Sequence, residues 1–483
     1  MKIKTIITIL LIMFFLNNIS LADIQPLKVS ANGRYLVDSD GEPVFLNADT
    51  AWKIAWKLNR DEVEKYLQTR KDQKFNAIGI VAFPMDIDND RAITNVYGDK
   101  PLEYKNDKFN PLKPVTTSGE NHKNSKEYDY WDHLEYIIDT AESKNMYIIL
   151  LPAWGGRVAG AYGSGKPNSE IIFDKSKAYK YALWISKKFK DKKNIIWMIG
   201  GDRSAVYGKN DYRSVFRAMV KGLISGSGNK EILISYHPQK WAPNSSEWFH
   251  NSPWLSFNSI QDQPSDQIKA ITHDWNLKPA KPTWLFEGRY EGFTKDSVTF
   301  KDFQVRFQAY QTVFEGGLGE TYGNMAIWNF SKNWKKHIDD PGANQLRYLV
   351  KLMSLWSKEQ YLSRIPDQSL IIGNAGKISG SLDELSTCIA ATRTKKGDLA
   401  MIYTAAGNNL LIKMRILNGP MMHAYWYNPR TGKWKVAGKE VEKPTPFSND
   451  IHSGKKALNY QFYVPKMQKE SNDWVLILSN KKL

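Results

Sequence analysis

The sequence predicts a (β/α)8 barrel followed by a small all-β domain of sandwich type. Between residues 44 and 330, short apolar runs alternate with amphipathic helical stretches, which is typical of parallel strands that are each followed by a helix. There are eight such runs, and the size of the segment suits a closed barrel better than an open sheet. After Pro366 the pattern changes to short alternating strands separated by turn signals. We therefore expect a barrel domain over residues 23–365 and a β-sandwich domain over residues 366–483.

The first 22 residues have the features of a secretory signal peptide. Lys2 and Lys4 form a basic start, residues 6–16 are apolar, and small residues follow at 20–22. The apolar stretch is shorter than the roughly 20 residues that a membrane-spanning helix needs. We therefore expect export to the periplasm or the extracellular space, with no membrane attachment after cleavage. An uncleaved anchor is the alternative.

The barrel elements are expected in the following order. A hairpin around Asp40 and Gly41, a good tight-turn pair, leads into the first strand. The expected strands are 44–49, 77–83, 147–154, 195–202, 232–238, 255–261, 283–288 and 325–330. The expected helices include 61–74, 131–144, 177–190, 212–224 and 302–315, with a last amphipathic helix that begins near Pro341. The β domain should contain strands within 399–409, 411–416, 423–434 and 473–479.

Composition indicates a polyanionic or carbohydrate partner. The net charge of +17 suits a chain that meets polyanions, although a solubility bias would also produce it. Lysine-rich stretches are interleaved with acids and form no nucleic-acid module, so export favours an acidic polysaccharide over nucleic acid. The chain has 17 Trp and 24 Tyr, whose flat rings stack on sugar faces but also fill cores.

Several other kinds of site are excluded or not expected. Cys388 is the only cysteine, so an internal disulfide is impossible. The eight histidines form no H-x-x-x-H pair, so we expect no metal and no cofactor. A G-x-S-x-G elbow is absent, which argues against an ordinary α/β-hydrolase esterase.

Two carboxylates at expected strand ends form the strongest candidate site. Asp202 closes the fourth strand and Glu287 the seventh, and catalytic groups of such barrels sit at the carboxyl ends of strands. Strands three apart in an eight-stranded barrel face each other across the mouth, so the two groups can flank one bond. Glycoside hydrolysis needs such a pair. The alternative is a pair of turn acids that form ion pairs with Arg203 and Arg289.

Further candidates are expected to bind substrate. Asp49 and Trp52 follow the first strand and would hold the non-reducing sugar, while His237 would bond a substrate hydroxyl or the nucleophile. Stacking platforms are expected at Trp154, Tyr290, Tyr322 and Trp328. The alternatives are a structural role at the rim for His237, packing of Trp52 under the helix that it begins, and core packing for any one of the stacking residues.

Several motifs resemble the apiosidase-like glycoside hydrolases, which are barrel enzymes of a retaining clan. They are FLNADTAW (45–52), IIWMIGGD (195–202), SYHP (235–238), FEGRYEG (286–292), GGLGETYGNMAIW (316–328) and PGANQL (341–346). The C-terminal WYNPRTGKW and DWVLIL resemble the small β domain, labelled as collagen-binding, that often follows this barrel.

This resemblance implies that Asp202 is the acid/base and Glu287 the nucleophile. It also implies apiose in branched pectin (rhamnogalacturonan II) as the substrate. Gly288 stands where the family often has proline, and Glu320 where histidine is common. These departures leave the catalytic pair in place and the sugar specificity open.

The sequence therefore predicts an exported retaining glycoside hydrolase that acts on side chains of plant or other complex polysaccharides. A non-catalytic polysaccharide- or collagen-binding protein on a barrel scaffold is the alternative. Peptide hydrolysis is suggested only by the label of the β domain, and no serine, cysteine or metal constellation supports it. The sequence makes no prediction of oligomeric state.

Overall fold

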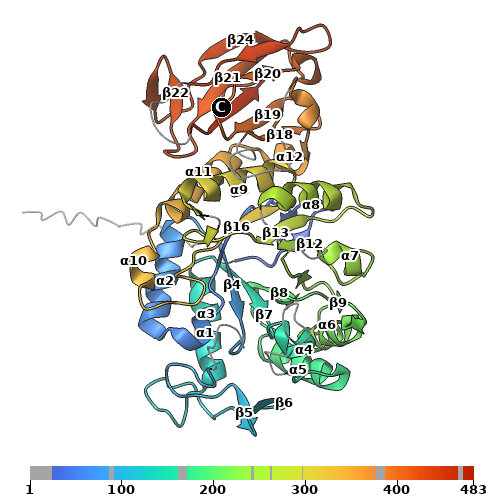
Figure 1. The fold of residues 1–483 in the computed structure, drawn as a ribbon, viewed down its shortest axis with the longest axis vertical. Coiled ribbons are helices and arrows are strands. Elements are labelled where there is room, and N and C mark those ends of the chain that lie inside the picture. Colours follow the sequence, from blue (N-terminus) through green and yellow to red (C-terminus); the bar gives the residue numbers. More distant parts are fainter. Residues whose placement is uncertain are drawn as a thin grey trace, which may run out of the picture.

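The computed structural model describes residues 24–85, 92–160, 171–240, 244–261, 264–295, 297–373, 375–376, 387–465 and 472–483. The expected signal peptide lies outside these residues. The described chain forms a barrel and a C-terminal β domain that packs against helices α9 and α11 at one end of it (Figure 1). None of the helices in these ranges combines the length and the apolar character that crossing a bilayer requires.

Eight parallel strands form the barrel. They are β3 (Leu46–Thr50), β4 (Ala77–Val81), β7 (Tyr147–Leu151), β8 (Ile195–Gly200), β11 (Ile234–His237), β12 (Asn258–Gln261), β13 (Thr283–Glu287) and β16 (Gly319–Tyr322). Six pair in the order β11-β8-β7-β4-β3-β16, and β12 pairs with β13. One hydrogen bond joins each of the two remaining pairs of neighbouring strands. Leu318 N, directly before β16, donates to Thr283 O of β13 at 2.9 Å, and Ser235 Oγ of β11 donates to Phe257 O, directly before β12, at 2.6 Å. The ring is therefore closed, and the predicted barrel is confirmed.

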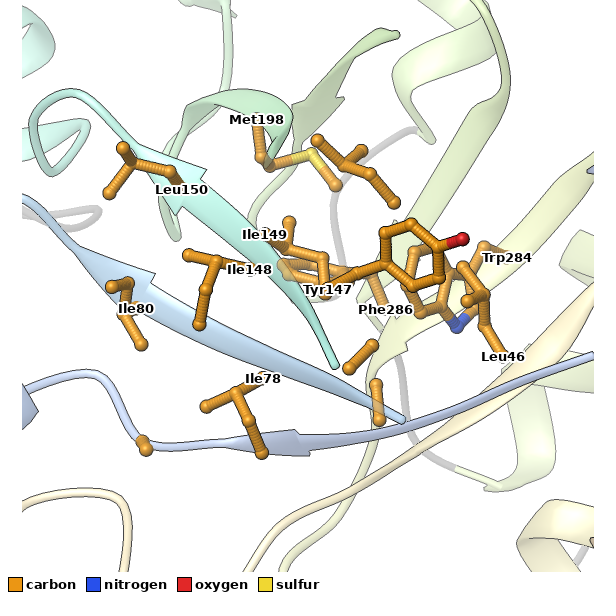
Figure 2. Close-up of a cluster of buried hydrophobic side chains, with 14 of the residues drawn as sticks. Leu46, Ile78, Ile80, Tyr147, Ile148, Ile149, Leu150, Met198, Trp284 and Phe286 are labelled. Carbon is orange, nitrogen blue, oxygen red and sulfur yellow. The ribbon is translucent and has the colours of Figure 1, made fainter. Parts of the chain in front are cut away.

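Apolar side chains fill the barrel interior. Figure 2 shows this cluster, in which Ile78, Ile149 and Met198 come from different strands. Trp284 and Phe286 of β13 belong to the same cluster, with ring centroids 5.2 Å apart. Because β13 ends at Glu287, the candidate nucleophile follows directly from this packed core.

Helices follow most of the barrel strands. The longer ones are α2 (Arg60–Asp72), α3 (Tyr130–Ser143), α5 (Lys175–Lys188), α6 (Arg213–Ser227), α8 (Pro264–Asn276), α9 (Asp302–Phe314) and α11 (Pro341–Met353). The shorter ones are α1 (Ile54–Lys57), α4 (Gly156–Ala159), α7 (Ser245–Phe249), α10 (Trp334–His337) and α12 (Lys358–Leu362). Asn59 and Asp129 begin α2 and α3 with capping boxes, which satisfy the first free amide groups of each helix.

Short strands complete this part of the chain. They are β1 (Lys28–Val29), β2 (Leu36–Val37), β5 (Leu102–Lys105), β6 (Lys108–Pro114), β9 (Val206–Tyr207), β10 (Asn210–Asp211), β14 (Thr294–Lys295) and β15 (Val298–Thr299). The β5–β6 hairpin follows the carboxyl end of β4 and lies at the end of the molecule opposite the C-terminal domain (Figure 1).

The eighth barrel strand lies earlier than predicted. Residues 325–330 form turns, and the strand is β16, within a glycine-rich stretch that has the composition of a loop. Gly319 explains the difference, because a Cβ at this position would lie 2.2 Å from Leu46 O of β3. The small residue that suggested a loop is what allows this strand to pair closely.

The C-terminal domain is an antiparallel all-β domain, as predicted, and most of its strands belong to one sheet. Its order is β17 (Arg364–Pro366), β18 (Ile389–Thr394), β19 (Leu399–Thr404), β26 (Trp474–Ser479), β21 (Met421–Tyr427), β22 (Trp434–Val436) and β23 (Lys439–Val441). β24 (Ser448–His452) joins this sheet by pairing with β21, whereas β20 (Leu410–Ile412) and β25 (Tyr460–Phe462) pair with each other in a separate two-stranded sheet. Short 3-10 turns lie at Gln368–Leu370 and Met414–Ile416.

The C-terminal sheet is buried on both faces. Along β19, Met401 and Tyr403 join the barrel core, whereas Ala400 and Ile402 belong to the domain's own core. This alternation follows from the two-residue period of a strand. The ring of Tyr403 stacks on Tyr310 of α9 at 4.9 Å, so the two parts share one continuous core.

A buried ionic cluster also joins the two parts. Arg306 of α9 donates from Nε to Asp473 Oδ2 at 2.8 Å, and both side chains are fully buried. Arg430 of the β domain donates to Asp473 Oδ1 at 2.8 Å. Asp473 therefore stands between two guanidinium groups, one from each part of the molecule.

Candidate active site

Glu287 receives hydrogen bonds at both carboxylate oxygens. His237 Nε2 lies 2.8 Å from Oε2, and Gln261 Nε2 donates to the same oxygen at 3.0 Å. The hydroxyl of Tyr290 donates to Oε1. His237 ends β11 and Gln261 ends β12, so three neighbouring strands fix this carboxylate at the barrel mouth.

Tyr290 links Glu287 to the buried ring of Trp52. Burial, and then the charge of Glu287, raise the pKa of Tyr290 well above its usual value, so its phenol keeps the proton that it donates. Trp52 Nε1 donates to the hydroxyl of Tyr290 at 2.8 Å. The chain from Trp52 through Tyr290 to Glu287 therefore orients the carboxylate.

Asp202 follows β8 in a strained turn. Gly200, Gly201 and Asp202 all have positive φ, at 86°, 117° and 51°. Aspartate tolerates this region better than most residues do. Gly201 N donates to His237 O at 3.1 Å, which ties the turn to the end of β11. The double glycine of the sequence thus serves to aim the carboxyl of Asp202.

We expect Gly201→Ala to reduce both stability and turnover. A Cβ at Gly201 would lie 2.7 Å from the Trp154 ring, and its φ is unfavourable for an L residue. The change should lower the free energy of unfolding by about 1–3 kcal/mol. It should lower kcat by up to about 100-fold, because Asp202 is displaced. Gly208→Ala is the matched control, since Gly208 also has positive φ but nothing within 4 Å of its added Cβ. Equal losses of kcat in the two variants would contradict this account.

Asp202 is set up to hold a proton. Burial, and then the charge of Glu287, raise its pKa to about 6, although Arg203 opposes the shift. Its Oδ1 is buried and has no hydrogen-bond partner within the described ranges. Arg203 Nη1 lies 3.4 Å from Asp202 Oδ2, but it bonds the backbone oxygen of Asp202 at 2.6 Å. The Asp202–Arg203 ion pair, which was the alternative role for Asp202, is therefore present, but the distance between its nitrogen and oxygen is long.

The pKa of Asp202 predicts a falling activity above pH 6. An acid catalyst must be protonated, so kcat/KM should decline tenfold per pH unit once pH exceeds about 6. A pH profile of kcat/KM checks this, and a flat profile to pH 8 would contradict it. Because the charge of Glu287 raises this pKa, Glu287→Gln should lower it, as followed by carbon-13 NMR of the carboxyl group.

Four rings form the floor of the site. Trp52 lies 5.5 Å from Trp154, 5.6 Å from His237 and 5.7 Å from Phe286, measured between ring centroids. Both tryptophans are almost fully buried, so they support the catalytic groups more than they offer open faces to a sugar. The indole nitrogen of Trp154 is buried and has no hydrogen-bond partner among the described residues.

Asp49 does not lie where the sequence suggested. Its carboxylate is wholly buried, and Tyr66 OH and Arg70 Nε both bond its Oδ2 at 2.6 Å. Both partners come from α2, the helix packed outside the strands. Asp49 therefore anchors α2 to β3 and offers no surface to a sugar.

Tyr322 is directed toward the helices, whereas Trp328 lies beside Lys53, the neighbour of Trp52. Tyr322 is buried and donates to Glu291 Oε2 at 2.6 Å, which makes it part of the packing between strand and helices. Trp328 is half-buried, with the Lys53 amino group 4.9 Å from its ring centroid. The structure thus brings together Asp202, Glu287, His237, Tyr290, Trp52 and Trp154.

Gln261 is the functional residue that sequence reasoning missed. Its only signal was its position at the end of the sixth strand, level with His237 and Glu287.

Glu320 is a further acid at a barrel strand. Its pKa is raised well above the usual value, first by desolvation and then by the charge of Asp49. Glu320 is therefore a fully buried acid on β16 whose charged form is disfavoured.

A parallel barrel with two carboxylates at its mouth, one hydrogen-bonded and one with a raised pKa, defines a glycoside hydrolase. Residues 30–358 match the apiosidase-like catalytic domain, and the chain belongs to this family. Residues 365–479 match the "Putative collagen-binding domain of a collagenase".

Two solved structures resemble the whole molecule. One is described as a glycoside hydrolase, is 28% identical, and aligns over 95% of this chain and 98% of that chain with a TM-score of 0.75. The other is a glycoside hydrolase family 5 protein from Bacteroides vulgatus ATCC 8482, 26% identical, with 94% and 93% of the chains covered and a TM-score of 0.75. No curated protein matches the sequence.

Proposed function

We propose that the protein hydrolyses glycosidic bonds with retention of configuration, Asp202 as acid/base and Glu287 as nucleophile. The observation that supports these roles is the contrast between the two carboxyl groups. Both oxygens of Glu287 accept hydrogen bonds that hold the carboxylate in place for attack, while burial and like charge raise the pKa of Asp202 to about 6, which suits a proton donor. A retaining mechanism requires one carboxylate that attacks and one acid that donates a proton.

The reaction proceeds in two steps. Glu287 attacks the anomeric carbon while Asp202 gives its proton to the glycosidic oxygen, so the sugar becomes an ester of Glu287 and the leaving chain departs as an alcohol. Asp202, now ionised, then takes a proton from water, whose oxygen attacks the anomeric carbon and frees Glu287. The hydrogen bond from Tyr290 orients the attacking carboxylate in the first step.

We propose a side chain of plant or other complex polysaccharide as the substrate, in particular apiose in branched pectin (rhamnogalacturonan II). Membership of the apiosidase-like family supports the sugar. The net charge of +17 supports an acidic polymer such as polygalacturonate. Export, expected from residues 1–22, would bring the enzyme to such material.

Sugar release tests this proposal. The purified protein and its Glu287→Ala variant are incubated with branched pectic oligosaccharides, and the products are identified by mass spectrometry. A pentose-sized product from the parent alone supports both the reaction and the substrate. Release of a different sugar keeps the reaction and overturns the substrate. If neither protein releases a sugar from pectic, hemicellulosic or host glycans, the alternative of a non-catalytic binding protein is favoured.

A further inference from the structure

The C-terminal domain carries an aromatic groove that catalysis does not use. Two hollows, of about 440 and 580 Å³, flank β25 and share Gln461 and Tyr463 in their walls. The aromatic groove is the combined surface whose lining includes Trp426, Phe447, Tyr460, Phe462, Tyr463, Lys435, Asn408 and Asn409. Because the two hollows adjoin each other across Gln461 and Tyr463, they suit an extended chain better than a compact small molecule.

Exposed rings distinguish this groove from ordinary core packing. Tyr463 is 73% exposed and Tyr460 is 44% exposed. Phe447 lies nearly parallel to Trp426, with ring centroids 6.0 Å apart and planes inclined by 13°. Buried Trp426 and Phe462 thus support a layer of rings that the domain core does not need, and such flat faces stack on sugar rings.

The groove is separate from the catalytic cluster. Trp426 and Phe462 belong to the domain's own core, whereas the other face of the sheet packs on the barrel helices. The hydrogen-bond partners found for Glu287 in the described chain all come from the barrel. A ligand in the groove can therefore be bound whether or not the barrel is active.

The polar lining indicates the ligand's chemistry. Among the described residues that line the two hollows, Lys435 is the only charged side chain and none is a carboxylate. Amides of Gln461, Asn408 and Asn409 can exchange hydrogen bonds with hydroxyl groups. Residues 366–483 carry 17 basic and 9 acidic groups, a net charge of +8 (17 − 9), which suits an anionic ligand.

We propose that the aromatic groove binds a uronic-acid-containing polysaccharide chain, with Tyr460 and Tyr463 as stacking platforms and Lys435 as the partner of a carboxylate. Binding there holds the barrel near the same polymer and raises the local concentration of cleavable side chains. Binding to the groove follows from its own lining, whereas the effect on cleavage rests on the proposed function.

Affinity electrophoresis of the full chain in gels containing polygalacturonate tests the groove. The Glu287→Gln background keeps the polymer intact, and thermal unfolding checks that each variant is folded. We expect Tyr463→Ala and Tyr460→Ala each to weaken retention by about three- to tenfold. Lys435→Gln should weaken it at low salt and less at high salt.

Two exposed positions outside the groove serve as controls. Met421→Ala, at the start of β21, and Lys395→Gln, after β18, should retain parental affinity. The proposal is overturned if the parent does not bind polygalacturonate or if both tyrosine variants bind as well as the parent. It is also overturned if the tyrosine variants lose affinity for triple-helical collagen peptides but not for polygalacturonate.

Discussion

Glu287→Gln should lower kcat by at least about 10⁴-fold while leaving the fold intact. The amide cannot form the glycosyl ester, and it preserves the shape of the side chain while keeping one of the two hydrogen-bond acceptor oxygens. Initial rates on the sugar-releasing substrate, together with thermal unfolding, measure the two effects separately. NMR of the first product formed by the parent should show retained anomeric configuration.

Glu315→Gln is the matched control for this change. Glu315 is also a buried barrel acid, but it lies at the end of α9 beside Gln368, and burial raises its pKa to about 7. Its replacement should leave kcat within twofold of the parent. If Glu287→Gln retained more than about 1% of parental kcat, the nucleophile would have to be another group.

Asp473→Asn should cause the largest loss of stability. The amide would leave the buried cation of Arg306 and the neighbouring cation of Arg430 without their shared counter-charge. Removing one member of a buried ion pair costs about 3–5 kcal/mol in the free energy of unfolding. Urea unfolding followed by tryptophan fluorescence measures the loss.

Asp450→Asn provides the comparison, because Asp450 is an exposed acid on β24 of the same domain. An exposed substitution of this kind should change the free energy of unfolding by less than about 0.5 kcal/mol. A similar small change for Asp473→Asn would show that the ionic cluster does not stabilise the contact between the two parts.

Sequence reasoning predicted the barrel because its strands are nearly continuous apolar runs, which both-side burial requires. It failed at β16, where the decisive constraint was a close approach between Gly319 and Leu46 rather than an apolar pattern. Such an approach depends on the partner strand, which lies more than 270 residues away, and no local window contains it.

Contacts between distant parts of the chain also explain which of the predicted residues lie in the candidate site. Position at a strand end was enough to select Asp202, Glu287 and His237. It was not enough for Asp49, because on a strand with two buried faces the sequence does not show which side chains turn toward the helices. Asp49 turns toward Arg70 of α2, an ion pair that only the folded chain reveals.

The order of the strands in the C-terminal sheet has a consequence for how the molecule is assembled. The central position between β19 and β21 is filled by β26, which lies at residues 474–479, and Asp473 directly precedes it. Until this segment is available, Arg306 of α9 lacks Asp473, one of its two carboxylate partners, and α9 lacks part of its apolar cover. The barrel surface and the β domain should therefore reach their final form together, late in synthesis, and unfold as one cooperative unit.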